Sequence, residues 1–281
     1  MISIIVSSLK KERLCTLRCN IADTIGDGVD FELLSRDNTI DPLPLAKVYN
    51  LLAAKAKGDC LLFIHEDAGF ISSGWGEIIE KKLSDKDCGL IGFAGGKVVA
   101  DAPGGWNVAP EFCIWHFREC GIDMSLNHNP DADFTPVAAI DGYAFFVRRE
   151  VWKEIPFDEK ALRGFHCYDV DYSLSVGRKY RNYVCENIYT YHDSPGNFGK
   201  DWTLATGDIY LEKWQGMLPV LAPGFSISEM EMKWFREKVF FRYIKSLRRF
   251  KLPDTEWIKL YKRLPATPLH LRHLIKLPFL K

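Results

Sequence analysis

The chain has 281 residues, of which 47% are hydrophobic and 26% are charged, and these are ordinary values for a globular protein. This length allows one large α/β domain with a small appendage, or two modest domains. The formal net charge is zero, so the charge of the whole protein favours no particular partner, and no nucleic-acid-binding module is recognisable.

Charge is unevenly distributed along the chain. From Glu229 to Lys281, fourteen Lys and Arg stand against five Asp and Glu, a net charge of +9 that leaves −9 for the preceding residues. The eight cysteines show no CxxC spacing, which indicates free thiols in a reducing compartment rather than a disulfide framework. No basic region precedes the apolar N-terminus, and no apolar run approaches the roughly 18 residues that span a membrane. We therefore expect a soluble, cytoplasmic protein.

The beginning of the sequence alternates strand and helix patterns. The β-branched run Ile2–Val6 predicts a buried strand, and Lys10–Ile25 predicts a helix that ends before a Gly-Asp-Gly sequence. A second strand is expected at Phe31–Leu34, a second helix at Leu45–Lys57, and a third strand at Cys60–Ile64. This alternation is typical of a doubly wound, nucleotide-binding sheet.

The third strand ends in His65-Glu66-Asp67, which places two adjacent carboxylates at its carboxyl end. Open α/β sheets bind their ligands at that edge. Adjacent carboxylates there suit a hard divalent cation, which would neutralise a diphosphate. The alternative is a solvated acidic loop without a ligand.

The middle of the chain is less regular. A helix is expected at Trp75–Leu83 and a strand at Gly89–Phe93. Residues 100–135 are rich in Gly, Pro, Asn and Asp, which predicts a long irregular segment of the kind that usually forms a functional loop or lid. Residues Val137–Val147 predict a strand interrupted at Asp141-Gly142.

The sequence YDVD at Tyr168–Asp171 opens another predicted helix. Acidic residues in a first helical turn interact favourably with the helix dipole, so capping is the default explanation for Asp169 and Asp171. A single strand is expected at Tyr183–Tyr191, and the region from Ser226 onward is expected to be helical, basic and aromatic.

With these elements placed, the chain resembles the family 2-type glycosyltransferases of the GT-A fold. The resemblance is closest to the bacterial glycosyltransferase-like group that carries an HxD triplet in place of the usual DxD, and it covers roughly residues 2–200. It depends on the order and spacing of six segments: IIVSS at Ile4–Ser8, YNLLAAKAKGDCLLFIHED at Tyr49–Asp67, IDGYAFFVRREVW at Ile140–Trp152, FDE at Phe157–Glu159, HCYDVDYSL at His166–Leu174, and YHDS at Tyr191–Ser194. The resemblance implies an α/β fold with a mixed sheet flanked by helices, followed here by a helical C-terminal extension.

The resemblance also implies roles at the matched positions. Asp67 and His192 would bind Mn²⁺ or Mg²⁺ that bridges the donor diphosphate, and Asp169 would be the general base. The predicted donor-binding residues are Ser7, Ser8, Asp37, Asn38 and Glu66. A helix-capping role for Asp169 and a surface position for His192 are the alternatives.

Two positions depart from the family pattern. His65 replaces the first Asp of DxD, which removes one hard oxygen ligand, and Tyr168 replaces the acidic residue that usually precedes the base. Asp171 is the main rival to Asp169 as the base and is otherwise expected on the acceptor side. The other predicted acceptor-binding residues are Asp141, His166 and Trp106, with packing or loop solvation as the alternative for the last two.

The expected function is transfer of a sugar from a nucleotide-diphosphate donor, most simply a UDP-sugar, to a glycan or lipid-linked acceptor. The expected mechanism is metal-assisted and inverting. Sugar-nucleotide pyrophosphorylases share the sheet topology, but they need a Gly-rich loop after the first strand, and Ser7-Ser8-Leu9-Lys10 has no glycine. A non-catalytic module that binds nucleotide sugars or glycans remains the alternative.

The sequence predicts a glycosyltransferase domain at residues 1–225 and a basic, aromatic helical extension at residues 226–281. Basic residues beside aromatic ones suit a helix that lies on anionic lipid, which predicts a peripheral contact with the inner face of the membrane. The alternative is that the aromatic side chains pack against the acidic domain.

Overall fold

The computed structural model describes residues 1–279, so the last two residues of the predicted extension, Leu280 and Lys281, lie outside the described range. Within that range, seven strands form the main sheet in the order β10-β13-β5-β12-β3-β1-β2. Their bounds are β1 Ile2–Ser8, β2 Phe31–Asp37, β3 Cys60–Ile64, β5 Cys88–Gly92, β10 Phe134–Val137, β12 Ala144–Arg148 and β13 Arg181–Cys185. β1 is parallel to β2 and β3, whereas β12 is antiparallel to β3 and β5, so the sheet is mixed.

The strand β3 lies inside this sheet, hydrogen-bonded to β1 on one side and β12 on the other. All five of its side chains are buried, as its uninterrupted apolar sequence predicts. The acidic triplet that follows β3 therefore begins at the carboxyl end of a central strand, where ligands of such sheets bind.

Five helices accompany the sheet: α1 Lys11–Thr24, α2 Leu45–Ala53, α3 Trp75–Leu83, α4 Arg149–Glu154 and α5 Tyr168–Gly177. The predicted helix at Leu45–Lys57 ends four residues earlier than expected, and its apolar side chains, among them Val48, Tyr49 and Leu52, are buried. α2 packs on β1 and β2, and α3 packs on β5 and β12. The βαβ arrangement expected for the first part of the chain is present.

A second sheet has the order β11-β6-β8-β14-β4, with β9 paired to β8. Its strands are β4 Ala68–Phe70, β6 Ala94–Gly96, β8 Cys113–Glu119, β9 Ile122–Leu126, β11 Ala139–Ile140 and β14 Thr190–His192. A short pair, β7 Val98–Val99 and β15 Val220–Leu221, lies apart from it.

Two expectations about these strands were wrong. The segment 100–135 is not wholly irregular, because β8 and β9 form a hairpin whose turn residues Cys120 and Gly121 both have positive φ, as tight hairpin turns require. The single strand expected at Tyr183–Tyr191 is two strands in different sheets, since β13 pairs with β5 and β14 pairs with β4 and β8.

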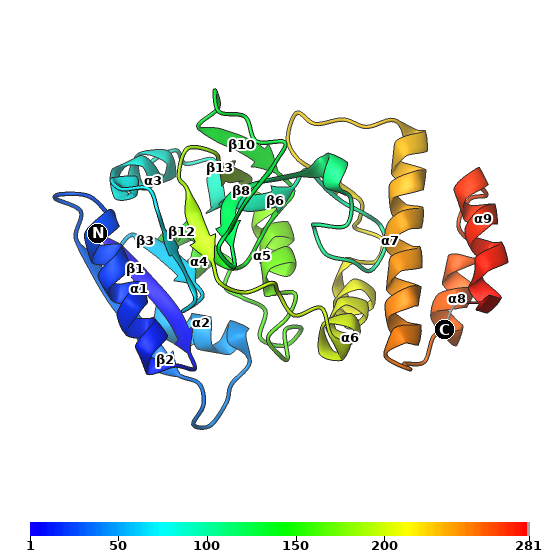
Figure 1. Ribbon diagram of the computed structural model, residues 1–281, viewed down its shortest axis with the longest axis horizontal. Helices are drawn as coiled ribbons and strands as arrows, with labels where there is room; N and C mark the ends of the chain where they lie inside the picture. Colours follow the sequence, from blue (N-terminus) through cyan, green and yellow to red (C-terminus); the bar gives the residue numbers. More distant parts are fainter. Residues whose placement is uncertain (280–281) are drawn as a thin grey trace.

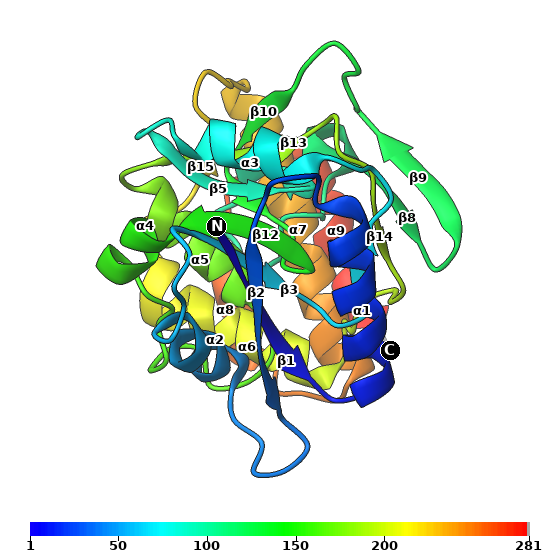
Figure 2. The same ribbon diagram turned by 90° about the vertical axis from the view of Figure 1, so that its left-hand side faces the viewer.

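The C-terminal part is helical, as predicted, and begins earlier than residue 226. It comprises α6 Lys200–Ile209, a π-helical turn η2 at Tyr210–Trp214, α7 Glu229–Arg249, α8 Thr255–Tyr261, α9 Pro268–Lys276 and the short η3 at Leu277–Phe279. α7 begins with a capping box formed by Ser228 and Glu231. Figure 1 shows α7, α8 and α9 gathered at the end of the molecule opposite α1, β1 and β2, and Figure 2 shows the same arrangement from the N-terminal end.

These helices share a second hydrophobic core with the segment 98–112, which includes the 3₁₀ turn η1 at Pro110–Phe112. The buried members from α7, such as Phe235, Val239 and Ile244, pack with Val98 and Ala102. Most aromatic side chains of the extension belong to this core, so packing accounts for them. None of the helices in residues 1–279 has the length and apolar character needed to cross a lipid bilayer.

Candidate active site

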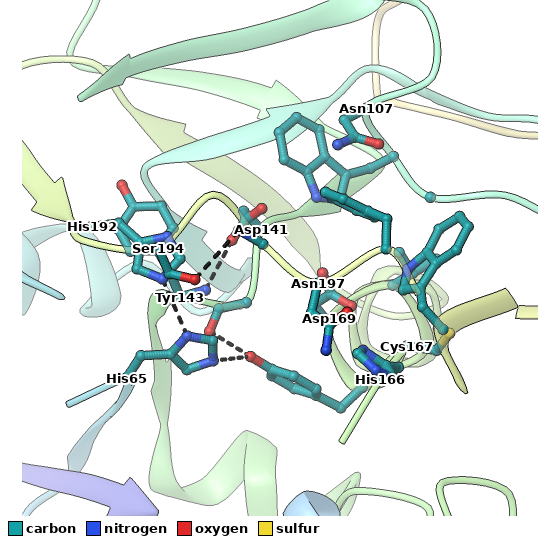
Figure 3. Close-up of a pocket in the computed structure, with 18 of the residues that line it drawn as sticks. His65, Asn107, Asp141, Tyr143, His166, Cys167, Asp169, His192, Ser194 and Asn197 are labelled. Carbon is teal, nitrogen blue, oxygen red and sulfur yellow. Dashed lines mark hydrogen bonds between the residues drawn. The ribbon is translucent and has the colours of Figure 1, made fainter. Parts of the chain in front are cut away.

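A pocket of about 350 Å³ lies where strands of both sheets approach the helices α5 and α6. Five segments form its wall: the end of β3, the residues around Asp141, the N-terminus of α5, the loop that follows β14, and residues 104–107. Figure 3 shows His65, Asp141, Asp169 and His192 around this space. Much of the pocket wall is aromatic, with Trp106, Trp115, Phe165, Phe198 and Trp202.

His65, Asp67 and His192 form a cluster beside the pocket in which one ligand atom from each lies within 4.8 Å of the others. His192 Nε2 is 3.4 Å from His65 Nδ1 and 3.6 Å from Asp67 Oδ1. Antiparallel pairing of β14 with β4 brings these distant residues together, because it sets His192 opposite Ala68, the neighbour of Asp67. The predicted metal ligands Asp67 and His192 therefore meet, and His65 joins them.

The donor atoms of this cluster fit a divalent metal ion. Two imidazole nitrogens and one carboxylate oxygen suit a first-row transition ion such as Mn²⁺ better than Mg²⁺, which prefers an all-oxygen set. Burial, and then the charge of His192, lower the pKa of His65 to about 4, so its ring is neutral near pH 7 and has one nitrogen free to bind metal. The second oxygen of Asp67 accepts a hydrogen bond from Arg13 Nη1 at 2.8 Å.

Glu66 does not belong to this cluster, and its carboxylate instead hydrogen-bonds the residues that lead into α1. Its Oε2 accepts hydrogen bonds from Ser8 Oγ at 2.8 Å, from the Leu9 amide at 2.9 Å and from the Lys10 amide at 3.0 Å. A helix N-terminus is a favourable place for an anion, and here the carboxylate of Glu66 occupies it. The amides that a phosphate would use in a Gly-rich loop are thus already bonded.

The other predicted donor-binding residues lie where β1 and β2 end. Ser7 pairs with Arg36, and Ser8 pairs with Asp37 across the parallel strands. Asp37 accepts hydrogen bonds from the amide and hydroxyl of Thr39, and Asn38 bonds both backbone groups of Leu43. These side chains stabilise the loop after β2 and are not among the residues that line the pocket. Their contact with a nucleoside stays a prediction.

Asp169 is the second residue of α5 and faces the pocket. Burial, and then the charge of Asp141, raise the pKa of Asp169 to about 7. Asp141 also lines the pocket, accepts a hydrogen bond from the Tyr143 amide at 2.9 Å, and has its own pKa raised by burial. A carboxyl group that titrates near neutral pH is suited to accept a proton from a hydroxyl group.

Asp171 lies on a different side of α5 because two residues along a helix correspond to a rotation of roughly 200°. Its carboxylate is 2% exposed, 2.9 Å from Lys213 Nζ, and accepts a hydrogen bond from Trp214 Nε1 at 2.8 Å. It is not among the pocket-lining residues. These contacts join α5 to η2 and leave Asp169 as the residue of the pair that faces the pocket.

His166 and Trp106 both line the pocket. His166 is half-buried, and burial lowers its pKa. Trp106 packs edge-on against Trp115 with ring centroids 6.1 Å apart. Their positions are compatible with the predicted acceptor side, where aromatic surfaces and polar edges would meet a sugar.

Sequence reasoning missed several residues of this site. Arg13 carries no motif and is recognisable only from its contact with Asp67. The aromatic side chains Phe198 and Trp202 belong to a loop and to the unpredicted helix α6. Tyr168 was noted only as a departure from the family pattern, yet its hydroxyl lies 2.7 Å from His65 Nε2.

Comparison with solved structures identifies the fold. A mannosyltransferase, PcManGT from Pyrobaculum calidifontis, in complex with GDP-Man and Mn²⁺, matches with a TM-score of 0.51 and 10% identity over 99% of this chain and 79% of that chain. GalNAc-T7 with UDP, GalNAc and Mn²⁺ matches with a TM-score of 0.53 and 11% identity over 90% of this chain and 58% of that longer chain. The expected GT-A fold is confirmed.

Comparison by sequence gives a consistent result. No curated protein matches the chain significantly. A sequence model of the family described as "Glycosyltransferase like family" matches residues 15–213, which is more than half of the chain and includes both the acidic triplet and α5. The chain therefore belongs to this glycosyltransferase-like family.

Proposed function

We propose that the protein transfers a sugar from a nucleotide-diphosphate donor, a UDP-sugar, to a hydroxyl group of a glycan or lipid-linked acceptor, with inversion and with the help of Mn²⁺ or Mg²⁺. One observation supports this most strongly: His65 and His192 of the metal-ligand cluster line the same pocket as Asp169, whose pKa is near 7. The two solved structures described above each contain a nucleotide or nucleotide sugar together with Mn²⁺.

The proposed mechanism divides the reaction between two sides of the pocket. His65, Asp67 and His192 would hold the metal ion, which when bound supplies positive charge to the leaving diphosphate. Asp169 accepts the proton of the attacking acceptor hydroxyl. Asp141 accepts hydrogen bonds from other acceptor hydroxyls, and the aromatic wall excludes water that would otherwise hydrolyse the donor.

Titration of UDP with and without Mn²⁺, by calorimetry, tests the donor and the metal together. We expect binding at least tenfold tighter with Mn²⁺, and we expect Asp67→Ala to remove that difference. Asp59→Ala is the matched control, because it removes an exposed carboxylate that lies outside the pocket, at the opposite end of β3 from Asp67. Equal affinity with and without Mn²⁺ in the wild-type protein would rule out the metal role of Asp67 and His192.

Donor hydrolysis distinguishes the enzyme from a non-catalytic binding module. A glycosyltransferase should slowly release UDP from its UDP-sugar in the presence of Mn²⁺, whereas a binding module should retain the donor intact. The pyrophosphorylase alternative is disfavoured because Glu66 occupies the helix N-terminus that would otherwise bind phosphate.

We also propose that the protein is cytoplasmic and contacts the inner face of the membrane through α9 and η3. Three apolar side chains there are exposed, namely Leu271 at 54%, Ile275 at 71% and Phe279 at 80%. The exposed basic residues Arg272 and Lys276 lie on the same helix. Apolar side chains flanked by cations fit an anionic lipid surface, and a lipid-linked acceptor would be available there.

A further inference from the structure

We infer that Tyr168 is a positioning residue for the metal site: its hydroxyl fixes the ring of His65 in the tautomer that presents Nδ1 to the metal. This inference rests on the proposed metal-dependent function and deepens it. His65 and Tyr168 are the two positions at which the chain departs from the family pattern, and the structure places them in contact. They are 103 residues apart in sequence, yet His65 Nε2 lies 2.7 Å from Tyr168 Oη.

The direction of this hydrogen bond follows from a second contact of the same hydroxyl. Tyr168 Oη donates to the carbonyl oxygen of Gly142 at 2.9 Å, and a carbonyl oxygen can only accept. The tyrosine has one hydroxyl hydrogen, so towards His65 its oxygen acts as an acceptor. The hydrogen between the two side chains therefore belongs to Nε2 of His65.

The tautomer determines what the other nitrogen can do. A neutral imidazole carries one hydrogen, so a hydrogen on Nε2 leaves the lone pair of Nδ1 free. That nitrogen faces the cluster, 3.4 Å from His192 Nε2. Metal-binding histidines commonly donate a hydrogen bond from the N–H of their second ring nitrogen to an oxygen acceptor, and this acceptor orients the ring. Tyr168 thus compensates for the replacement of an aspartate by His65.

Packing holds the hydroxyl of Tyr168 in place. The side chain is 4% exposed and meets the ring of Tyr49 edge-on at 5.7 Å. A Cβ atom on Gly142 would lie 2.3 Å from Tyr168 Oη, so only a glycine at that position allows the hydroxyl to reach the carbonyl. The ring is therefore fixed by its neighbours, and Tyr168→Phe should remove the hydrogen bond while keeping the packing.

The arrangement joins the two sides of the pocket through one helix turn. Tyr168 and Asp169 are the first two residues of α5, so the residue that orients a metal ligand adjoins the proposed base. A shift of the start of α5 would move both groups together. The hydrogen bond to His65 therefore accounts for the tyrosine at position 168, where the family pattern has an acid.

The test measures Mn²⁺ binding directly, without substrate, by electron paramagnetic resonance of the free ion. We expect Tyr168→Phe to weaken Mn²⁺ binding by about 10- to 100-fold, the usual effect of losing a partner of a metal ligand. Tyr172→Phe is the matched control, because Tyr172 lies one turn further along α5, is equally buried, and has no hydrogen-bond partner for its hydroxyl among the described residues. It should bind Mn²⁺ like the wild type.

Two further readouts separate positioning from a general loss of structure. In His65→Asn, the side-chain oxygen can reach the place of Nδ1 without help from Tyr168, so adding Tyr168→Phe should cause no further loss of affinity. Nitrogen-15 NMR of the histidine rings should show Nε2 of His65 protonated in the metal-free wild type and a mixture of tautomers in Tyr168→Phe.

The outcomes distinguish this inference from the function on which it rests. Unchanged Mn²⁺ affinity in Tyr168→Phe, with normal binding by the wild type, would overturn the inference and leave the metal-dependent function standing. No Mn²⁺ binding by the wild type, with or without UDP, would overturn the metal-dependent function and the inference with it. Equal losses from Tyr168→Phe in the wild-type and His65→Asn backgrounds would also contradict a role through His65.

Discussion

Asp169 combines two properties that oppose each other: a half-buried position that disfavours its charged form, and a proposed role as a base that needs this charge. Burial and the neighbouring Asp141 raise its pKa to about 7, so the carboxylate form predominates only above that pH. The folded protein binds the carboxyl proton of Asp169 more tightly than the unfolded chain does, because the pKa of an aspartate in an unfolded chain is about 4. The contribution of Asp169 to stability therefore falls as the pH rises from about 4 to about 7.

Replacement of Asp169 by Asn should reduce kcat by about 100-fold or more, because it removes the proton acceptor and keeps the size of the side chain. In the wild type, kcat should rise with pH through about 7, and the variant should lose that rise. At pH 8 the variant should melt at the same or a higher temperature, since it lacks a charge that desolvation and Asp141 disfavour. Kinetics from pH 5.5 to 9 and thermal unfolding at pH 8 measure these effects.

Asp171, not Asp169, would be assigned as the general base if Asp171→Asn lost the pH-dependent rise in kcat and Asp169→Asn kept it. UDP binding serves as the control for both variants. It should be nearly unchanged in Asp169→Asn, because the donor and the base are on different sides of the pocket in the proposed mechanism.

At the scale of elements, α5 and η2 are joined by a buried ion pair. Asp171 accepts from Lys213 and Trp214, and Lys213 also bonds Asp158 at 3.0 Å. Burial raises the pKa of Asp171, while Lys213 acts in the opposite direction. The charged form of Asp171 is therefore stabilised by Lys213. The contacts of Asp171 with Lys213 and Trp214 also hold η2 in place beside α6, which helps to form the pocket.

Loss of Lys213 should destabilise the protein. We expect Lys213→Met to lower the free energy of unfolding by about 3 kcal/mol, because it leaves the buried Asp171 without its cation. The double variant Asp171→Asn/Lys213→Met should recover part of that loss. Lys179→Met, which breaks an exposed pair with Glu154, should cost less than about 1 kcal/mol. Urea unfolding measures all three, and equal losses from Lys213→Met and Lys179→Met would contradict the structural role of the pair.

The elements differ in how readily the sequence predicts them. β3 and α2 were predicted because a short, fully apolar run and a regular apolar spacing are local signals. β4 and β14 have three residues each, too few to show a period, and yet their pairing brings His192 to Asp67. The motif resemblance supplied Asp67, Asp169 and His192, whereas the contact of His65 with Tyr168 depends on tertiary structure and has no local signal.

At the scale of the whole molecule, the C-terminal helices support the wall of the pocket. A Cβ atom on Gly104 would lie 2.5 Å from Val239 Cγ1 of α7, so the backbone of a pocket-lining residue lies directly on that helix. Ion pairs from Lys238 to Glu111 and from Arg236 to Asp101 tie the same segment to α7. The opposite charges of the two parts of the chain thus meet at this contact.

Enlarging Gly104 should therefore disturb acceptor binding. We expect Gly104→Ala to raise the acceptor KM several-fold and to lower stability by about 1–3 kcal/mol, the usual cost of overpacking. Gly164→Ala is the control, because a Cβ atom there would meet no other atom within 4 Å and Gly164 does not line the pocket. Acceptor kinetics and urea unfolding measure the effects. An unchanged acceptor KM in Gly104→Ala would show that α7 does not set the position of this wall.

The proposed membrane contact requires a test that keeps this core intact. We expect the full-length protein to pellet with vesicles of anionic lipid at low salt and to be released by salt. Leu271→Ser/Ile275→Ser should reduce the bound fraction severalfold. Leu9→Ser/Ile40→Ser is the matched control, since those exposed side chains lie in the N-terminal part, at the other end of the molecule from α9. Equal pelleting of the two double variants would exclude the α9 surface as the contact.

The close approach of Gly104 to Val239 also limits how this protein can be recombined with its relatives. Residues 98–112 lie far from α7, α8 and α9 in sequence but share one hydrophobic core with them. A chimera that exchanges only the C-terminal helices would place foreign side chains against an unmatched loop and would deform the pocket beside it. Residues 98–112 and the C-terminal helices should therefore be exchanged together, because a functional chimera needs both halves of this core.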